Sequence, residues 1–276
     1  RRFWRDWTGA IKREYPNFAN LGELYDGNPA MTAFFQGGAK RFDGVDSGFD
    51  TVFDFPLMYP IRKAFANGDD LRELPKMLAH DYMYPNPDLL VTFLGLHDMQ
   101  RFMSEPNASA KGLMLAQTFL MTTRGVPMLY YGDEIGMTGA NDPDNRRDFP
   151  GGWREDSRDA FTEKGRTIEE NQIFNHVKNL TRIRRELEPL RGGKLVNLLS
   201  DAQQQYAFAR VSKQNSVIVV FNNAKQPATI EFPVDSLNLQ NAALVDKMNV
   251  SSDLTVENGK MKVTVAGRSA SIFTTK

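Results

Sequence analysis

Four apolar β-type runs, each ending in polar residues and followed by a helix-like stretch, constrain the fold of this sequence more than any other feature. The runs are residues 18–24, 49–55, 89–98 and 126–131, and the helical patterns include residues 58–66, 110–122 and 168–188. Short buried strands joined through crossover helices are typical of a parallel sheet. About 190 residues carry the four units, whereas a closed (β/α)₈ barrel needs eight units in roughly 250 residues. The pattern of these first 190 or so residues therefore predicts half of a TIM barrel or an open α/β sheet.

After Pro189 the pattern changes to short strands with turn residues between them. The predicted strands are residues 195–199, 206–211, 217–221, 228–232, 254–257 and 261–265. Such spacing indicates a separate antiparallel domain, most commonly a β-sandwich. We therefore predict two domains, an α/β part over residues 1–190 and an all-β part over residues 191–276.

The charge balance limits the class of partner. Lys+Arg and Asp+Glu both count 34 among 276 residues. No net field favours nucleic acid, a membrane surface or a polyanion, so we expect a neutral substrate. No apolar run approaches the roughly 20 residues that span a bilayer. The sequence has no cysteine, which excludes disulfides and thiolate metal sites but does not fix the compartment.

The first residues have the pattern of the interior of an amphipathic helix. Phe3, Trp4, Trp7 and Ile11 recur at a spacing of three to four residues, with charged residues between them. Neither an initial Met nor an apolar secretory segment precedes them. We interpret the sequence as a piece of a longer chain.

Polar side chains collect at the carboxyl ends of the predicted strands, the end that holds the active site in barrels and open α/β sheets. They are Glu23, Asp54, His97, Asp98, Asp133 and Glu134. A carboxylate at the end of an apolar strand is costly unless it is hydrogen-bonded or functional, so a buried network or a helix cap explains a single one equally well. Several acids from separate strands favour a site. Paired carboxylates hydrolyse glycosidic bonds, one as proton donor and the other as nucleophile or as stabiliser of the oxocarbenium ion.

Three segments, in this order, resemble the α-amylase family of glycoside hydrolases. They are residues 21–29 (LGELYDGNP), similar to the acid/base segment on strand five, residues 93–102 (FLGLHDMQRF), similar to the His-Asp motif on strand seven, and residues 125–136 (GVPMLYYGDEIG), similar to strand eight. Residues 142–147 (DPDNRR) look like the next loop in cyclomaltodextrinases and neopullulanases. With the β domain, the resemblance covers nearly the whole sequence. It implies the second half of a (β/α)₈ TIM barrel, strands five to eight, followed by a C-terminal antiparallel β-sandwich domain.

The resemblance also implies roles for single residues. Glu23 and Asp98 become the catalytic candidates: Glu23 as general acid and then base, Asp98 as the carboxylate that binds the hydroxyls of the distorted sugar and stabilises the transition state. His97 would hydrogen-bond the same sugar. The alternatives are a surface glutamate after a strand, and a helix-capping aspartate beside a core histidine.

Other substrate-binding candidates surround these residues. Arg101 belongs to the strand-seven segment, and Tyr25, with Asp26, follows the acid on the leaving-group side. Asp142 and Arg146 resemble residues of a more distant sugar subsite, although a local salt bridge on a solvated loop explains them equally well. Trp153 either stacks on a sugar ring or packs within its own loop.

Two features depart from the family pattern. Leu96 stands where the strand-seven motif often has Asn, a residue that some cyclodextrin-degrading members also lack. The Gly-Phe-Arg-x-Asp pattern with the nucleophile of strand four, and the earlier His motif of strand three, do not occur in the sequence. Residues 1–15 resemble the helix just after strand four. We read Asp54, Asp133 and Glu134 mainly as structural.

The predicted function is retaining hydrolysis of α-1,4-glucosidic bonds in starch-derived oligosaccharides or cyclodextrins, with an α-glucan oligosaccharide as substrate. A transglycosylase of the same family and a non-catalytic α-glucan-binding protein are the alternatives. Without the nucleophile, this sequence alone is expected to be inactive.

Partners and metals follow from the same reasoning. Unpaired strand edges predict a covering partner, either a missing N-terminal barrel half or a second copy; nucleic acid and membrane are not expected. None of His80, His97 and His176 falls in a metal-ligand motif. The calcium sites of the family use mostly residues upstream of this sequence, so we expect neither a metal nor a cofactor here.

Overall fold

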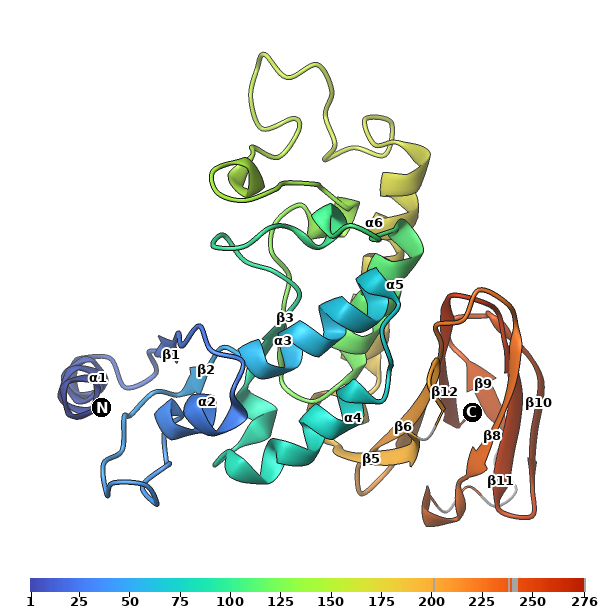
Figure 1. Cartoon of the computed structure of the whole chain (residues 1–276), viewed down its shortest axis with the longest axis horizontal. Coiled ribbons are helices and arrows are strands. Elements are labelled where there is room, and N and C mark those ends of the chain that lie inside the picture. Colours follow the sequence, from blue (N-terminus) through green and yellow to red (C-terminus); the bar gives the residue numbers. More distant parts are fainter. Residues whose placement is uncertain (201, 238, 240–242, 276) are drawn as a thin grey trace.

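The structure is a computed structural model that describes residues 1–200, 202–237, 239 and 243–275. Its α/β part and its β domain lie side by side, with the long loops that follow β3 and β4 at one end (Figure 1).

Four short parallel strands form the sheet of the α/β part. They are β1 (Leu21–Gly22), β2 (Thr51–Val52), β3 (Val91–Phe93) and β4 (Val126–Met128). β1 pairs with β2, β3 pairs with β4, and a parallel bridge between Phe53 and Val91 joins the two pairs. The strands therefore follow one another in chain order, as consecutive strands of a barrel do.

Helices precede, connect and follow these strands. They are α1 (Arg2–Glu14), α2 (Pro29–Phe35), α3 (Phe55–Arg62), α4 (Glu73–Leu78), α5 (Ala110–Thr122), α6 (Ile168–Glu186) and α7 (Pro189–Gly192). Short helical turns are η1 (Lys63–Asn67), η2 (Ala79–Met83), η3 (Pro87–Leu89), η4 (Phe102–Ser104), η5 (Asp133–Ile135), η6 (Asp144–Arg146) and η7 (Asp235–Leu237). Ser109 caps α5, and Thr167 opens α6 with a capping box that includes Glu170. These caps satisfy amides that a helix start leaves free, so both helices begin where the apolar pattern begins.

The strands are much shorter than the apolar runs predicted. The second run was expected to continue to residue 55, but Phe55 is the first residue of α3. The Asp54 carboxylate caps this helix by accepting a hydrogen bond from the Leu57 amide at 3.3 Å, and Pro56 occupies its first turn. Both features favour a helix start, so the strand ends two residues before the cap.

The β domain consists of two antiparallel sheets. Its strands are β5 (Lys194–Leu199), β6 (Gln205–Val211), β7 (Ser216–Asn222), β8 (Ala228–Pro233), β9 (Leu244–Asp246), β10 (Ser251–Glu257), β11 (Lys260–Val265) and β12 (Ser269–Thr275). One sheet has the order β5-β6-β7-β12-β9 and the other the order β10-β11-β8. The six predicted strands are confirmed, whereas β9 and β12 were missed. β12 lies inside the larger sheet, but its serines and threonines hide the apolar alternation of a buried strand.

One aromatic core joins the two parts. Phe65 and Phe119, from the helical layer, contact Phe208 and Phe221 of the β domain, with centroids 5.7 Å apart for Phe65 and Phe221 and 6.0 Å apart for Phe119 and Phe208. All four side chains are fully buried. Burial of large aromatic rings stabilises strongly, so the β domain acts as a fixed support for the helices behind the sheet.

Candidate active site

Glu23 stands at the carboxyl end of β1. It directly follows Gly22, and its side chain is exposed. A Cβ on Gly22 would lie 3.0 Å from the ring of Phe49, so a larger residue here would require this ring to shift. The Gly22 carbonyl accepts a hydrogen bond from the Phe53 amide at 3.1 Å. The strand is thereby fixed, while the carboxylate after it stays open to a substrate.

The turn after Glu23 is held by its own polar residues. The Asp26 carboxylate accepts a hydrogen bond from the Asn28 amide at 2.7 Å, and the Asn28 side chain caps α2. The Tyr25 ring packs on Phe55 with centroids 4.5 Å apart and is half exposed. Asp26 therefore stabilises the turn, whereas Tyr25 offers an aromatic surface next to the predicted acid.

His97 and Asp98 follow β3, and both side chains are exposed. His97 Nε2 lies 3.4 Å from Asp98 Oδ1. β1 and β3 flank β2, so Glu23 and Asp98 follow strands about 10 Å apart at the usual strand spacing. The two predicted catalytic carboxylates thus lie on the same edge of the sheet.

Arg146 brings a second loop to Asp98. Its Nη2 lies 3.1 Å from Asp98 Oδ1, and its Nε donates to the His97 carbonyl oxygen at 3.0 Å. The same Nε lies 2.9 Å from Asp142 Oδ1. The local salt bridge between Asp142 and Arg146 is therefore present, but Arg146 also contacts the carboxylate predicted to bind the sugar. Four of the predicted site residues meet in one exposed cluster.

The structure corrects the role of Arg101. Its side chain is 1% exposed, so it cannot contact a substrate in this conformation. Nη1 donates to the Tyr131 carbonyl oxygen at 2.6 Å, and the guanidinium lies over the Tyr130 ring at 4.6 Å from its centroid. Proximity to the His-Asp motif made Arg101 a candidate, but its side chain points beneath the loops and supports them from below.

Asp133 and Asp54, which follow β4 and β2, are buried beside arginines. Asp133 Oδ1 lies 3.6 Å from Arg101 Nη1, and burial raises the pKa of Asp133 to about 7 despite this neighbour. Asp54 pairs with Arg124, which also binds Asp81 at 2.7 Å. Burial alone would lower the pKa of Arg124, but the two carboxylates outweigh it and raise that pKa. Neither aspartate is free for chemistry, in agreement with their structural interpretation.

Trp153 lies in the long loop between β4 and α6 with 63% of its side chain exposed. Asp156 holds this part of the loop by accepting hydrogen bonds from the Gly151 amide at 2.7 Å and the Trp153 amide at 3.1 Å. These amides lower the pKa of Asp156. The indole therefore does not pack within its own loop and is open to a ligand.

Arg62 and Asn145 are supporting residues that the sequence patterns did not single out. Arg62, on α3, donates from Nη1 to the Leu94 carbonyl oxygen at 2.7 Å and pairs with Glu105 at 2.6 Å. It is 5% exposed. The available signal was a cation in the middle of the apolar helical pattern 58–66. Asn145, in the loop after β4, is fully buried.

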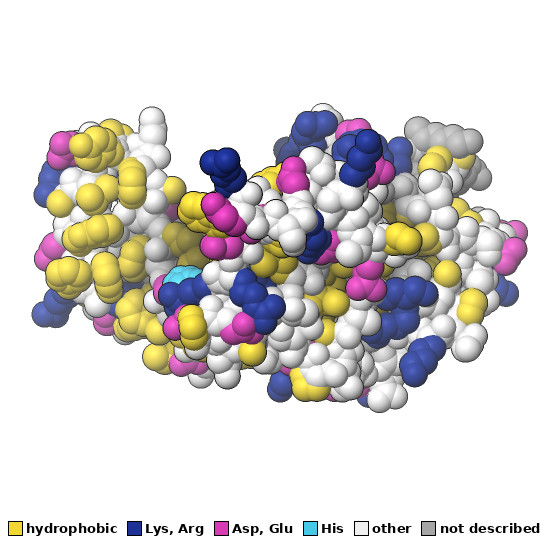
Figure 2. Space-filling model, turned by 90° about the horizontal axis from the view of Figure 1, so that it is seen from above, with side chains coloured by type: hydrophobic (Ala, Val, Ile, Leu, Met, Phe, Trp, Pro, Cys, Tyr) yellow, Lys and Arg dark blue, Asp and Glu magenta, His cyan; other side chains and the backbone are white. Residues whose placement is uncertain are grey.

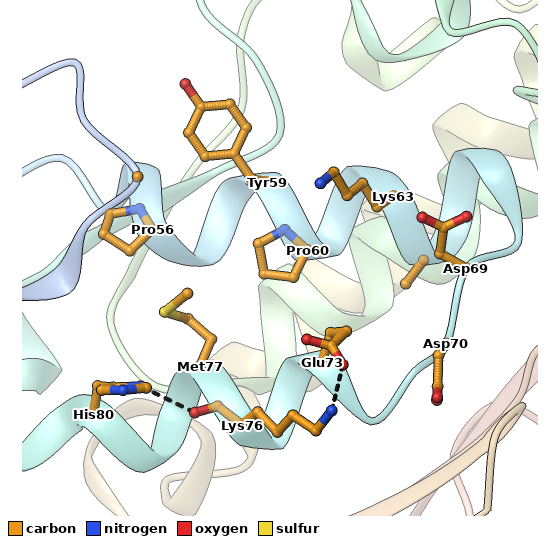
Figure 3. A pocket seen from close by; sticks show the side chains of 12 residues that line it. Pro56, Tyr59, Pro60, Lys63, Asp69, Asp70, Glu73, Lys76, Met77 and His80 are labelled. Atoms are coloured by element: carbon orange, nitrogen blue, oxygen red, sulfur yellow. Dashed lines mark hydrogen bonds and ion pairs between the residues drawn. The ribbon is translucent and has the colours of Figure 1, made fainter.

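A groove of about 320 Å³ lies between α3 and α4, on the outside of the α/β part (Figure 3). Pro56, Pro60 and Met77 line it together with a charged rim. In the rim, Lys76 Nζ donates to the Glu73 carboxylate at 2.5 Å. The groove contains none of the predicted site residues.

The described part of the chain has neither a metal-binding cluster nor a membrane-spanning helix. No group of three or more His, Cys, Asp or Glu side chains there could hold a metal ion. No helix within those residues is both long and apolar enough to cross a membrane.

Known families match the chain over nearly its full length. Residues 1–193 match the α-amylase catalytic domain, and residues 191–272 match the neopullulanase-like C-terminal domain. A cyclomaltodextrinase from Geobacillus thermopakistaniensis is 27% identical over 241 residues, which are 85% of this chain and 37% of that protein. Neopullulanase 2 from Thermoactinomyces vulgaris is 30% identical over 233 residues, 83% of this chain and 36% of that protein.

Solved structures agree on the fold. The α-amylase from Geobacillus thermoleovorans in complex with acarbose has a TM-score of 0.81 and 24% identity, covering 100% of this chain and 57% of that chain. The chain spans little more than a third of the length of the two curated relatives, 37% and 36%.

Parallel strands in barrel order, carboxylates at their shared edge and the match over residues 1–193 define the class: the chain belongs to the α-amylase family of glycoside hydrolases. Its β domain is of the neopullulanase-like C-terminal type. The predicted fold, the second half of a (β/α)₈ barrel followed by an antiparallel β-sandwich domain, is confirmed.

Proposed function

We propose that this chain supplies the acid/base residue and the sugar-binding carboxylate of a retaining α-glucan hydrolase. One observation carries the proposal: Glu23 and Asp98 are exposed carboxylates on one edge of the sheet, whereas Asp54 and Asp133, after β2 and β4, are buried beside arginines. We also propose that the chain has two domains, the α/β part over residues 1–190 and the β domain over residues 191–276.

Each residue has a separate task in this reaction. Glu23 protonates the leaving oxygen and then deprotonates the attacking water. Asp98, held by Arg146 at 3.1 Å, accepts hydrogen bonds from the hydroxyls of the reacting sugar and stabilises its positive charge. His97 donates to the same sugar. Tyr25 and Trp153 are exposed aromatic rings that fit the apolar faces of neighbouring glucose units.

A retaining reaction also needs a nucleophilic carboxylate about 5–5.5 Å from the acid. Asp54 is the strand-end acid nearest in the chain, but its ion pair with the buried Arg124 holds it away from this task. We propose that the nucleophile comes from residues outside this sequence, so that the 276 residues alone turn over α-glucans at background rate. The matched relatives are nearly three times as long as the region they share with this chain, which leaves room for such residues.

The same reasoning extends to the open face of the sheet. Within the described residues, β1 pairs only with β2 and β4 only with β3. Hydrophobic side chains gather over the N-terminal segment (Figure 2). The exposed ones there are Phe3, Trp4, Trp7, Tyr15, Phe18 and Leu21. We propose that this face is covered by the other half of the barrel, or failing that by a second copy.

Replacing Glu23 by Gln in the complete protein that carries this sequence tests the acid role. The variant keeps the shape but has no proton to donate, so kcat on maltooligosaccharides should fall about 10²–10⁴-fold. Binding of the substrate should change little. With α-maltosyl fluoride, whose leaving group needs little protonation, the first step should recover much of its rate. A kcat close to that of the wild type on natural glucans would remove Glu23 from the mechanism.

A further inference from the structure

Asn145 connects the loop after β4 to the loop after β3 from a buried position. Its side chain is 0% exposed, and Nδ2 donates to the His97 carbonyl oxygen at 2.7 Å and to the Met99 carbonyl oxygen at 2.8 Å. These two carbonyls belong to the residues on either side of Asp98. One amide group therefore fixes the backbone on both sides of the sugar-binding carboxylate.

Arg101 makes the reverse connection. Its Nε donates to the Asn145 carbonyl oxygen at 2.9 Å, and its own amide donates to the Gly139 carbonyl oxygen at 2.9 Å. The buried Arg101 side chain of the loop after β3 thus binds the backbone of the loop after β4. The buried Asn145 side chain of the loop after β4 binds the backbone of the loop after β3. The packing is close, because a Cβ on Gly139 would lie 2.6 Å from the Cα of Asn145.

The neighbour of Asn145 completes the arrangement. Arg146 Nη2 lies 3.1 Å from the Asp98 carboxylate, while the Asn145 side chain hydrogen-bonds to the backbone next to Asp98. Two consecutive residues of one loop therefore set both the backbone and the side chain of Asp98. The Asp98 and Arg146 side chains are 41% and 43% exposed, so their geometry depends on the buried residue more than on packing of their own.

We propose that Asn145 is a positioning residue for Asp98. The inference rests on the proposed function, because Asp98 is the group that contacts the sugar. Asparagine suits the task because its NH₂ group has two donors for two carbonyls. An aspartate would turn an oxygen toward the same carbonyls, and an alanine would leave both without a partner in a buried place.

The test is a double-mutant cycle in the complete protein. Asn145→Ala should lower kcat on maltooligosaccharides by about 10–100-fold, because displacement of a catalytic group by about 1 Å has an effect of that size. KM should change less. In the Asp98→Asn background the same substitution should lower kcat less than about threefold, because Asn145 acts through Asp98. Equal losses in both backgrounds, or an unchanged kcat in Asn145→Ala, would overturn the proposal.

A matched control lies in another loop. Asn171 also holds a loop through Nδ2, which donates to the Glu163 carbonyl oxygen at 2.9 Å, but it does not contact the residues around Asp98. Asn171→Ala should leave kcat within about twofold of the wild type. A loss in this control as large as in Asn145→Ala would show that loosening any loop suffices and would overturn the proposal.

A readout independent of activity separates this inference from the proposed function. Asn145→Ala should accelerate amide hydrogen exchange in residues 97–101 at least tenfold, and Asn171→Ala should not. If the wild type hydrolyses no α-glucan, the proposed function fails, and this exchange alone decides whether Asn145 holds the loop. Unchanged exchange would refute it. If Asn145→Ala does not fold, Asn145→Ser takes its place in the test, because serine keeps one hydrogen-bond donor. The loss of kcat and the faster exchange should then both be smaller.

Discussion

Asp133 is 4% exposed, and burial raises the pKa of its carboxyl to about 7, although Arg101 and Arg62 act in the opposite direction. Between about pH 4 and pH 7 the folded protein keeps a proton on Asp133 that the unfolded chain has released. The stabilisation that results is fully present below the pKa of the unfolded chain. It is lost as the pH rises through the folded value.

Asp133→Asn should abolish this pH dependence, because the amide is neutral at every pH. The wild type loses stability over this pH range and the variant does not. The free energy of unfolding of the variant minus that of the wild type should therefore increase by on the order of 2–4 kcal/mol between about pH 4.5 and pH 8. Urea denaturation at both pH values measures the difference. Asp148→Asn, at an exposed aspartate, serves as the control. A constant difference between Asp133→Asn and the wild type would show that Asp133 is ionised throughout.

The role of a single residue could be predicted only where it did not depend on contacts with residues far away in the chain. Asp98 and Arg146 were both singled out from the sequence as candidates, because each lies in a recognisable segment. The contact between them, 48 residues apart in the chain, could not be predicted. Arg101 was placed wrongly, because the sequence does not say whether a side chain points up to the site or down to Asp133. Asn145 looks like an ordinary turn residue until the carbonyls that it binds are known.

At the level of elements, α3 is tied to the loop after β3 by an ion pair at the edge of the core. Arg62 binds Glu105 at 2.6 Å, with side chains 6% and 16% exposed, and donates to the carbonyl oxygens of Leu94 and Gln100. Removing one partner of a buried pair leaves the other charge without compensation.

Arg62→Met should therefore lower the free energy of unfolding by about 3–5 kcal/mol. A matched pair on α6 supplies the control: Arg182 binds Glu186 at the same 2.6 Å, but both side chains are nearly half exposed. Arg182→Met should lower it by less than about 1 kcal/mol. Thermal and urea denaturation of both variants give the comparison. Equal effects of the two substitutions would show that burial does not control the strength of the Arg62 pair.

Helices were easier to predict than strands. Residues 110–122 match α5 in full, because an apolar pattern and a cap at Ser109 coincide there. Residues 168–188 match α6 except for the last two, where Leu187 leaves the helix before Pro189. The strands of the α/β part have only two or three residues each, and an apolar run does not show where pairing stops. Their order in the sheet was correct, since chain order alone determines it in this fold.

At the scale of the whole molecule, the open edge of the sheet at β1 and the apolar side chains of the N-terminal segment have no covering partner among the described residues. Phe3 is 67% exposed and Trp7 43% exposed, next to an edge strand that has a single neighbour. Large contiguous apolar surface beside an unpaired strand favours association.

The 276-residue chain, expressed alone, should therefore sediment as assemblies larger than a monomer. Replacing Trp4 and Trp7 by Lys should reduce this association, because both rings lie on the exposed apolar face. Lys substitutions at Tyr82 and Ile168, which are exposed away from both edge strands, would control for added charge. Sedimentation of the unsubstituted chain as a well-behaved monomer would contradict the proposed covering of this face.

The acid/base role of Glu23 is tested most directly by azide rescue in the complete protein. Azide attacks a glycosyl-enzyme without help from a base, so it bypasses the step for which Glu23 is needed. Glu23→Gln, acting on α-maltosyl fluoride, should turn over at least tenfold faster with azide and release α-maltosyl azide, the configuration of the substrate. Glu257→Gln, at an exposed position of the β domain, should respond to azide as the wild type does. Absence of azide acceleration, or a β-azide product, would contradict the assignment.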